Sequence, residues 1–183
     1  MLIIGITGTL GAGKGTIVDY LVSEKGFIHF SVRAFISEEI IRRGMKVDRD
    51  SMVVVANDLR KSNSPSYITD CLFDKASQTG KNSIIESIRT PGEVYSLRKK
   101  GNFILLAVDA DPQIRYQRIR QRKSETDQVD FKTFIENEQR EMNSTDPNAQ
   151  NVSRCVVLAD YKLVNNGTIV QLNRQVESIL ERL

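Results

Sequence analysis

The chain has 183 residues, of which 40% are hydrophobic and 27% charged. This composition suits one well-packed domain over residues 1–183 and excludes collagen-like, low-complexity and intrinsically disordered chains. The net charge is only +3, and the apolar runs fall far short of the roughly 20 residues of a membrane-spanning helix, so neither a nucleic-acid nor a membrane partner is expected. We expect a cytoplasmic protein, monomeric or homodimeric, with Cys71 and Cys155 reduced and buried.

A glycine-rich loop follows the first predicted strand at residues 2–6. The loop reads Gly8-Thr9-Leu10-Gly11-Ala12-Gly13-Lys14-Gly15-Thr16 and leads into a helix-periodic stretch. Closely spaced glycines let backbone N–H groups point inward, and the N-terminus of the next helix adds positive charge, so this loop predicts a phosphate cradle. Lys14 is expected to reach the β- and γ-phosphates, and the Thr16 hydroxyl to bind Mg²⁺. The Gly-Lys-Gly-Thr ending resembles the loop of adenylate kinase and other nucleoside monophosphate kinases.

The region at about 33–80 is interpreted as the helices that bind the acceptor. Ser31 and Arg33 lie where a second strand meets a helix, and both are candidate acceptor contacts. The apolar run at 52–56 is interpreted as helix rather than strand. Arg60 either reaches the acceptor phosphate or ends a surface helix. The pair Ser64-Pro65 predicts the start of a further helix, because it combines a capping side chain with a proline at the first helical position.

A third strand at 83–85 ends in two charged residues, Glu86 and Arg89. Thr90 and Glu93 follow with the spacing of a capping box, which predicts a helix start at this point. Because ligands bind at the carboxyl edge of parallel sheets, Glu86 and Arg89 are expected to face the site. The resemblance to adenylate-type kinases implies that Glu86 holds Mg²⁺ through water or orients the acceptor, and that Arg89 binds the acceptor phosphate. A salt bridge between the two is the alternative.

A basic helix follows the fourth strand at 103–108, behind the cap Asp111. Arg115, Arg118 and Arg122 recur on it at three- and four-residue spacing and share one face. With a polar loop at 124–129 and a second helix leading to Arg140, the region at about 115–140 resembles the short helical lid of nucleoside monophosphate kinases and dephospho-CoA kinase. The resemblance implies that Arg118 and Arg122 stabilise the transferring phosphoryl group and that Arg140 contacts substrate. A solvated basic face is the alternative.

The C-terminal segment combines an edge strand at 161–164, the loop Asn165-Asn166-Gly167 and an amphipathic helix capped by Thr168. It resembles the corresponding segment of dephospho-CoA kinase and of archaeal adenylate-kinase-related proteins. The resemblance implies that this loop flanks the adenine of the nucleotide, although a tight turn explains the same residues. The residues implied to hold ATP are therefore Gly8, Gly11, Ala12, Gly13, Lys14, Gly15, Thr16, Asn165, Asn166 and Gly167.

Taken in chain order, these parts resemble the P-loop nucleoside/deoxynucleoside monophosphate kinase-like superfamily. The alternation of strands and helices predicts an α/β fold, a three-layer doubly wound parallel sheet of about five strands. The implied activity is Mg²⁺-dependent transfer of the γ-phosphoryl group of ATP to a (deoxy)nucleoside monophosphate. The alternatives are a dephospho-CoA kinase and a non-catalytic nucleotide-binding regulatory module. The sequence lacks the Asn-Lys-x-Asp motif of GTPases and the strand-end Asp-Glu of hydrolytic ATPases, which disfavours both classes.

Overall fold

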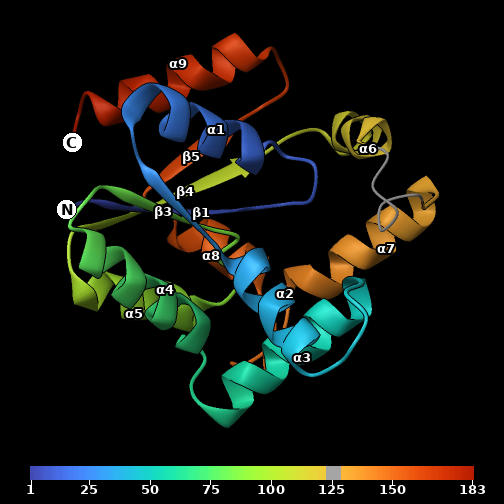
Figure 1. Ribbon diagram of the computed structural model, residues 1–183. Helices are drawn as coiled ribbons and strands as arrows, with labels where there is room; N and C mark the ends of the chain where they lie inside the picture. Colours follow the sequence, from blue (N-terminus) through green and yellow to red (C-terminus); the bar gives the residue numbers. More distant parts are fainter. Residues whose placement is uncertain (123–128) are drawn as a thin grey trace.

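Five parallel strands form the central sheet of the computed structural model, which describes residues 1–122 and 129–183 (Figure 1). The strands are β1 (Ile3–Gly8), β2 (Ile28–Ser31), β3 (Ser83–Glu86), β4 (Phe103–Asp109) and β5 (Tyr161–Val164), in the sheet order β2-β3-β1-β4-β5. All the pairings between neighbours are parallel, and Ile4 of β1 is in register with Ile84 and Ile104. The predicted α/β sheet and the edge position of 161–164 are thus confirmed.

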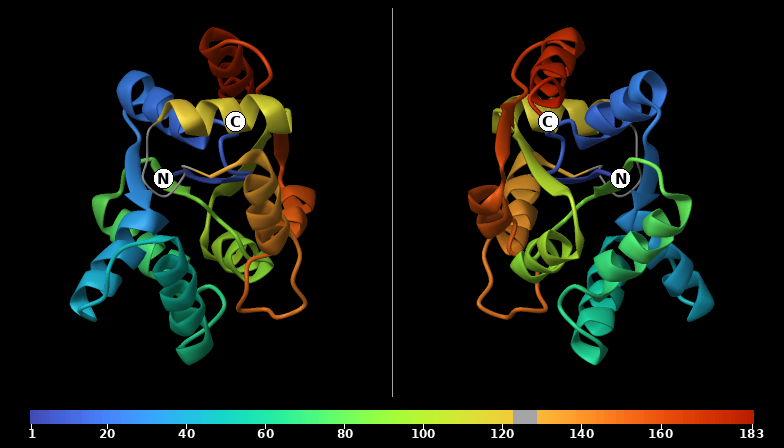
Figure 2. Two further views of the ribbon diagram at one scale, coloured as in Figure 1. Left: turned by 90° about the vertical axis from the view of Figure 1, so that its right-hand side faces the viewer. Right: turned by 90° about the vertical axis from the view of Figure 1, so that its left-hand side faces the viewer.

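Helices cover both faces of this sheet and complete three layers (Figures 1 and 2). One face carries α1 (Lys14–Lys25) and α9 (Ile169–Leu180), and the other carries α4 (Tyr67–Thr79), α5 (Pro91–Lys100) and α8 (Val152–Leu158). The remaining helices are α2 (Val32–Arg42), α3 (Arg49–Ser62), α6 (Pro112–Gln121) and α7 (Phe131–Met142). These four lie toward the carboxyl ends of the strands, at the right of Figure 1. Most of the polar loop predicted at 124–129 lies outside the described residues.

Two apolar clusters hold the three layers together. Successive side chains of a strand point to opposite faces, so Ile3 packs with α4 and α5 while Ile4 packs with α1 and α9. Ile3 and Ile4 are both almost fully buried, as expected for a central parallel strand that is covered on each side. The sheet is therefore a rigid base for the loops at its carboxyl edge.

The predicted helix starts are confirmed except for one. Thr90 and Thr168 form capping boxes at the starts of α5 and α9, and Asp111 caps α6. The helix predicted to begin at Ser64-Pro65 starts instead at Tyr67. The reason is that Pro65 packs against the start of α5, where its carbonyl oxygen accepts a hydrogen bond of 3.2 Å from the Thr90 hydroxyl. That contact fixes a turn at 64–66 and delays the helix.

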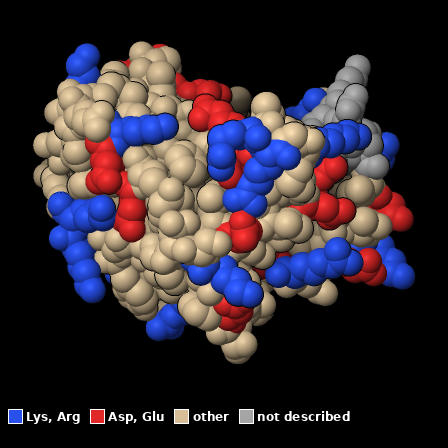
Figure 3. Space-filling view, turned by 60° about the horizontal axis from the view of Figure 1, so that its bottom comes forward, with Lys and Arg blue, Asp and Glu red and all other residues tan. Residues whose placement is uncertain are grey.

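The surface features agree only in part with the expectations from composition. No helix within residues 1–122 and 129–183 has the length and apolar character needed to cross a membrane. On the face shown in Figure 3, basic and acidic side chains are interspersed rather than gathered by sign. Cys155 is buried as expected, but Cys71 is only half-buried, because it lies beside the buried stripe of α4 instead of within it.

Candidate active site

The loop between β1 and α1 lies so close to its neighbours that glycine is required at two points. Gly8 has a φ of 140°, and a Cβ placed on it would lie 2.0 Å from the carbonyl oxygen of Val108. Gly13 has a φ of 109°, and a Cβ there would lie 2.3 Å from Nδ2 of Asn165. Positive φ values and close backbone approach are both costly for residues with a side chain. The shape of the loop is therefore fixed by its backbone.

Lys14 places a cation directly over this loop. Its ammonium group donates hydrogen bonds to the carbonyl oxygens of Gly8, at 2.9 Å, and Thr9, at 2.8 Å. Burial, assisted by the nearby positive charge of Arg89, lowers the pKa of Lys14 from 10.5 to about 7. An anion bound next to Lys14 would raise this pKa again, so the loop favours a negatively charged ligand.

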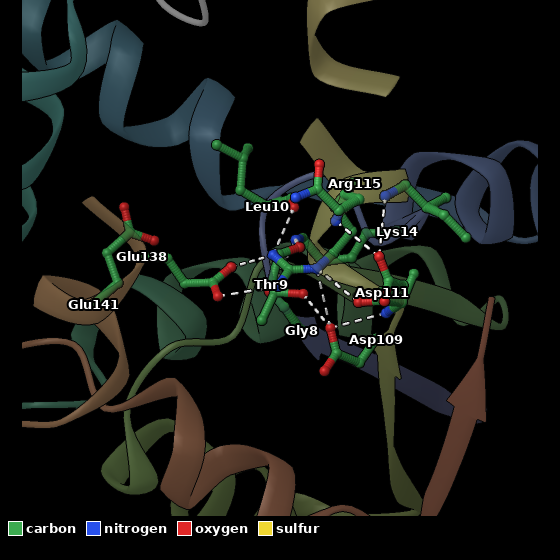
Figure 4. A network of polar contacts seen from close by, with 12 residues as sticks. Gly8, Thr9, Leu10, Lys14, Asp109, Asp111, Arg115, Glu138 and Glu141 are labelled. Atoms are coloured by element: carbon green, nitrogen blue, oxygen red, sulfur yellow. Dashed lines mark hydrogen bonds and ion pairs between the residues drawn. The ribbon is translucent and has the colours of Figure 1, made fainter. Parts of the chain in front are cut away.

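Two long-range contacts support the loop from behind. Nδ2 of Asn165 donates to the carbonyl oxygen of Ala12 at 2.8 Å. Arg115, only 2% exposed, donates from Nε to the carbonyl oxygen of Ala110 at 2.8 Å and from Nη1 to that of Leu10 at 3.3 Å. Figure 4 shows that this guanidinium also pairs with the carboxylate of Glu138 from α7. The alternative of a solvated basic face is therefore wrong for Arg115.

The loop 165–167 lies beside the phosphate loop, and Arg118 lies next to it. The Asn166 side chain accepts a hydrogen bond of 2.7 Å from the backbone N–H of Asp111. Nη2 of Arg118 lies 3.5 Å from both Oδ1 of Asn165 and the carbonyl oxygen of Gly167. Arg118 thus joins the segment that is expected to flank the base, and this position differs from its expected place at the transferring phosphoryl group.

A cavity of about 310 Å³ opens between the phosphate loop, α2, α3 and the end of β3. It brings together half of the predicted site residues, namely Gly11, Gly13, Lys14, Gly15, Arg33, Arg60, Glu86, Arg89 and Arg122. The other predicted residues lie outside its lining. Gly8 and Ala12 belong to the phosphate loop, and Asn165, Asn166 and Gly167 form the loop beside it. Thr16 is in the first turn of α1, Ser31 is behind Glu86, Arg118 is at the loop 165–167, and Arg140 is exposed on α7.

Glu86 is held by hydroxyl groups. Its carboxylate accepts hydrogen bonds from Ser87 at 2.7 Å and from Ser31 at 3.4 Å. Ser87 has a φ of 66°, a left-handed conformation that is uncommon for residues other than glycine and that often marks functional sites. Arg89 does not pair with Glu86, so the alternative of a mutual salt bridge is wrong.

Glu141 is the main site residue that sequence reasoning missed. Nη1 of Arg89 pairs with the Glu141 carboxylate and also donates to Gln150 at 3.0 Å, and Nη2 of Arg49 pairs with Glu141 at 2.7 Å. Burial raises the pKa of Glu141, but the guanidinium groups of Arg89 and Arg49 outweigh it and hold that pKa below its ordinary value of 4.5. Glu141 thereby ties α7 to α3 and to the end of β3.

Arg60 lies at the inner end of the cavity rather than at a surface. It is 2% exposed, and Nη2 and Nε lie 3.0 and 3.3 Å from Oε1 of the fully buried Glu93. The wall between Arg60 and the phosphate loop is apolar and was not predicted. Its residues are Leu10, Val32, Ile36, Met52, Val53 and Ala56.

Comparison with known proteins assigns the chain to a family. The chain belongs to a family described as AAA domain, whose model matches residues 4–144, and it has a P-loop kinase-like fold. A UPF0200 protein of Methanococcus maripaludis is 27% identical and aligns over 100% of this chain and 98% of its own length.

Two solved structures share the fold. The protein TT1252 from Thermus thermophilus aligns with a TM-score of 0.64 at 20% identity, covering 100% of this chain and 97% of that one. A shikimate kinase from Bacteroides thetaiotaomicron aligns with a TM-score of 0.59 at 14% identity, covering 98% of both chains. At these identities the likeness concerns the fold and not the substrate.

Proposed function

We propose that this protein is an ATP-dependent phosphotransferase that moves a γ-phosphoryl group onto a (deoxy)nucleoside monophosphate. One observation carries the proposal: Lys14 of the phosphate loop lines the same cavity as Glu86 and Arg89 at the end of β3. Phosphoryl transfer depends mainly on aligning donor and acceptor and on neutralising charge in the transition state. A cavity that joins a phosphate loop to strand-end charged groups supplies both requirements.

On the donor side, the phosphates of ATP would lie along the backbone N–H groups of residues 11–16, with Lys14 at the β- and γ-phosphates. Arg118 and the loop 165–167 would flank the base. The oxygen ligands that Mg²⁺ prefers are offered by the Thr16 hydroxyl and, through water, by the Glu86 carboxylate. When bound, Mg²⁺ would neutralise charge on the phosphates.

On the acceptor side, the cavity lining is more basic than acidic. The basic side chains are Lys14, Arg33, Arg49, Arg60, Arg89 and Arg122, and the acidic ones are Asp48, Glu86 and Glu141. Two phosphorylated substrates must meet in this space, so an excess of positive charge favours both their binding and the transition state. The apolar wall formed by α2 and α3 suits a planar ring. An acceptor with a phosphate and a base satisfies both parts of the cavity.

A coupled assay of ADP release tests the proposal. Mg-ATP is supplied together with AMP, CMP, UMP, GMP, their deoxy forms, dTMP or dephospho-CoA, with a reaction lacking acceptor as the control. We expect strong stimulation by at least one nucleoside monophosphate. Stimulation by dephospho-CoA alone would show that the acceptor is dephospho-CoA and not a nucleoside monophosphate. Binding of ATP without stimulation by any acceptor would overturn the proposal in favour of a non-catalytic regulatory module.

A further inference from the structure

One face of α3 runs the length of the acceptor cavity. Its cavity-lining residues are Arg49, Met52, Val53, Ala56 and Arg60. At about 100° per residue these five positions fall within a stripe roughly 100° wide, so they share one face of the helix. The face has an arginine at each end, about 16 Å apart along the helix axis, and apolar side chains between them. It matches a ligand that is charged at one end and flat in the middle.

The inner end of this face presents a fixed hydrogen-bond donor. Oε1 of Glu93 accepts hydrogen bonds from Nε and Nη2 of Arg60. Oε2 of Glu93 accepts hydrogen bonds from the backbone N–H groups of Arg89 and Thr90, at 2.8 and 3.0 Å. Glu93 is therefore fully engaged and holds the guanidinium in one orientation. Nη1 of Arg60 is buried and has no hydrogen-bond partner within the described residues. A buried donor without a partner is uncommon and points to a group that the protein itself does not supply.

We infer that Arg60 reads the base of the acceptor nucleotide, an inference that rests on the proposed function. The acceptor phosphate lies at the Arg49 end of this face, beside Arg89. The ring packs on Met52 and Val53, and Nη1 of Arg60 donates to the distal edge of the base. Arginine carries only donors. At this edge it therefore pairs with the keto oxygen O4 of uracil or thymine, or O6 of guanine, and opposes the amino group N4 of cytosine or N6 of adenine.

Substrate pairs that differ in that one group test the inference. We compare kcat/KM for UMP against CMP and for GMP against AMP, in the wild-type protein and in Arg60→Lys. The wild type should prefer the keto member of each pair by about tenfold or more, because an unpaired polar group at a buried site is poorly tolerated. Arg60→Lys keeps a positive charge for Glu93 but removes the second guanidinium nitrogen. It should bring the ratio close to one, mainly through a change in KM.

Arg98→Lys on α5 is the matched control, since Arg98 pairs with Asp160 at 2.7 Å and does not line the cavity. It should leave the ratio at the wild-type value, and thermal unfolding checks that both variants fold. A wild-type ratio near one, or a ratio that Arg60→Lys leaves unchanged, would overturn the role of Arg60 while the kinase assignment stands. If Arg60→Lys does not fold, the wild-type ratios decide alone. Lack of turnover with every nucleoside monophosphate would overturn both proposals.

Discussion

The two halves of the proposed site are built from different kinds of contact. The donor side, residues 8–16 and 165–167, is defined by the backbone: glycines are required by close approach, and Asn165 and Arg115 bind loop carbonyl groups. The acceptor side, formed by α2, α3, residues 86–89 and Glu141, is defined by contacts between side chains. Its structure depends on the ion pairs of Arg60 with Glu93 and of Glu141 with Arg49 and Arg89.

This difference explains how one fold serves several substrates. A cradle made from backbone N–H groups recognises phosphate and changes little when side chains are replaced. A site made from side-chain pairs changes its ligand when a few residues change. The donor side of this protein should therefore be sensitive to backbone changes, and its acceptor side to changes of charge.

The largest effect is expected from Lys14, the one charged side chain at the centre of the donor side. We expect Lys14→Ala to lower turnover by about 10³-fold, because the cation that neutralises the transferring phosphoryl group is lost. The measurement is ADP release with the best acceptor, together with ATP-analogue binding by calorimetry. Lys25→Ala is the control, since Lys25 pairs with Glu177 at 2.8 Å outside the cavity. Turnover of Lys14→Ala equal to that of Lys25→Ala would refute the assigned site.

The second prediction tests whether the backbone of the donor side fixes the shape of the loop. Gly8→Ala should lower the free energy of unfolding by about 3 kcal/mol, because it combines an unfavourable φ with a clash against backbone. Gly15→Ala introduces the same methyl group where a Cβ would have no neighbour within 4 Å. Its stability should stay within about 1 kcal/mol of the wild type. Urea unfolding of both variants measures the difference, and equal losses would show that the loop is not fixed by its backbone.

The sequence predicts the donor side better than the acceptor side. The phosphate loop was predictable because its glycines, lysine and threonine form one continuous segment, and Gly8, Gly13 and Lys14 lie as the pattern indicates. The capping box of Thr90 and Glu93 was predictable for the same reason. Local patterns report local hydrogen bonds, and these persist when the rest of the chain folds around them.

The acceptor side could not be predicted to the same extent, because its partners are distant in sequence. Glu93 was recognised as a capping residue, but Arg60, its ion-pair partner, lies 33 residues away. Glu141 pairs with Arg49 and Arg89, which lie 92 and 52 residues away in the sequence. Spacing rules describe one helix or strand, whereas these pairs depend on how separate helices pack.

The smallest expected effect concerns the ion pairs of Glu141 on the acceptor side. Because the arginines hold the Glu141 pKa below 4.5, its pairs contribute stability that is present above pH 4.5 and is lost as the pH falls through the lowered pKa. Glu141→Gln keeps the shape but removes the charge. It should be less stable than the wild type by about 1 kcal/mol at pH 7. The difference should shrink as the pH falls below about 4.5.

Thermal unfolding between pH 3 and pH 7 distinguishes this charge effect from a loss of packing. Glu136→Gln makes the same change on the same helix, where Glu136 is half exposed and its partner Lys132 lies 3.9 Å away. An exposed pair of this kind contributes little, so this variant should follow the wild type at every pH. A stability difference for Glu141→Gln that stays constant with pH would assign its effect to packing. The acceptor side would then rest on side-chain shape rather than on charge, and the contrast with the donor side would narrow.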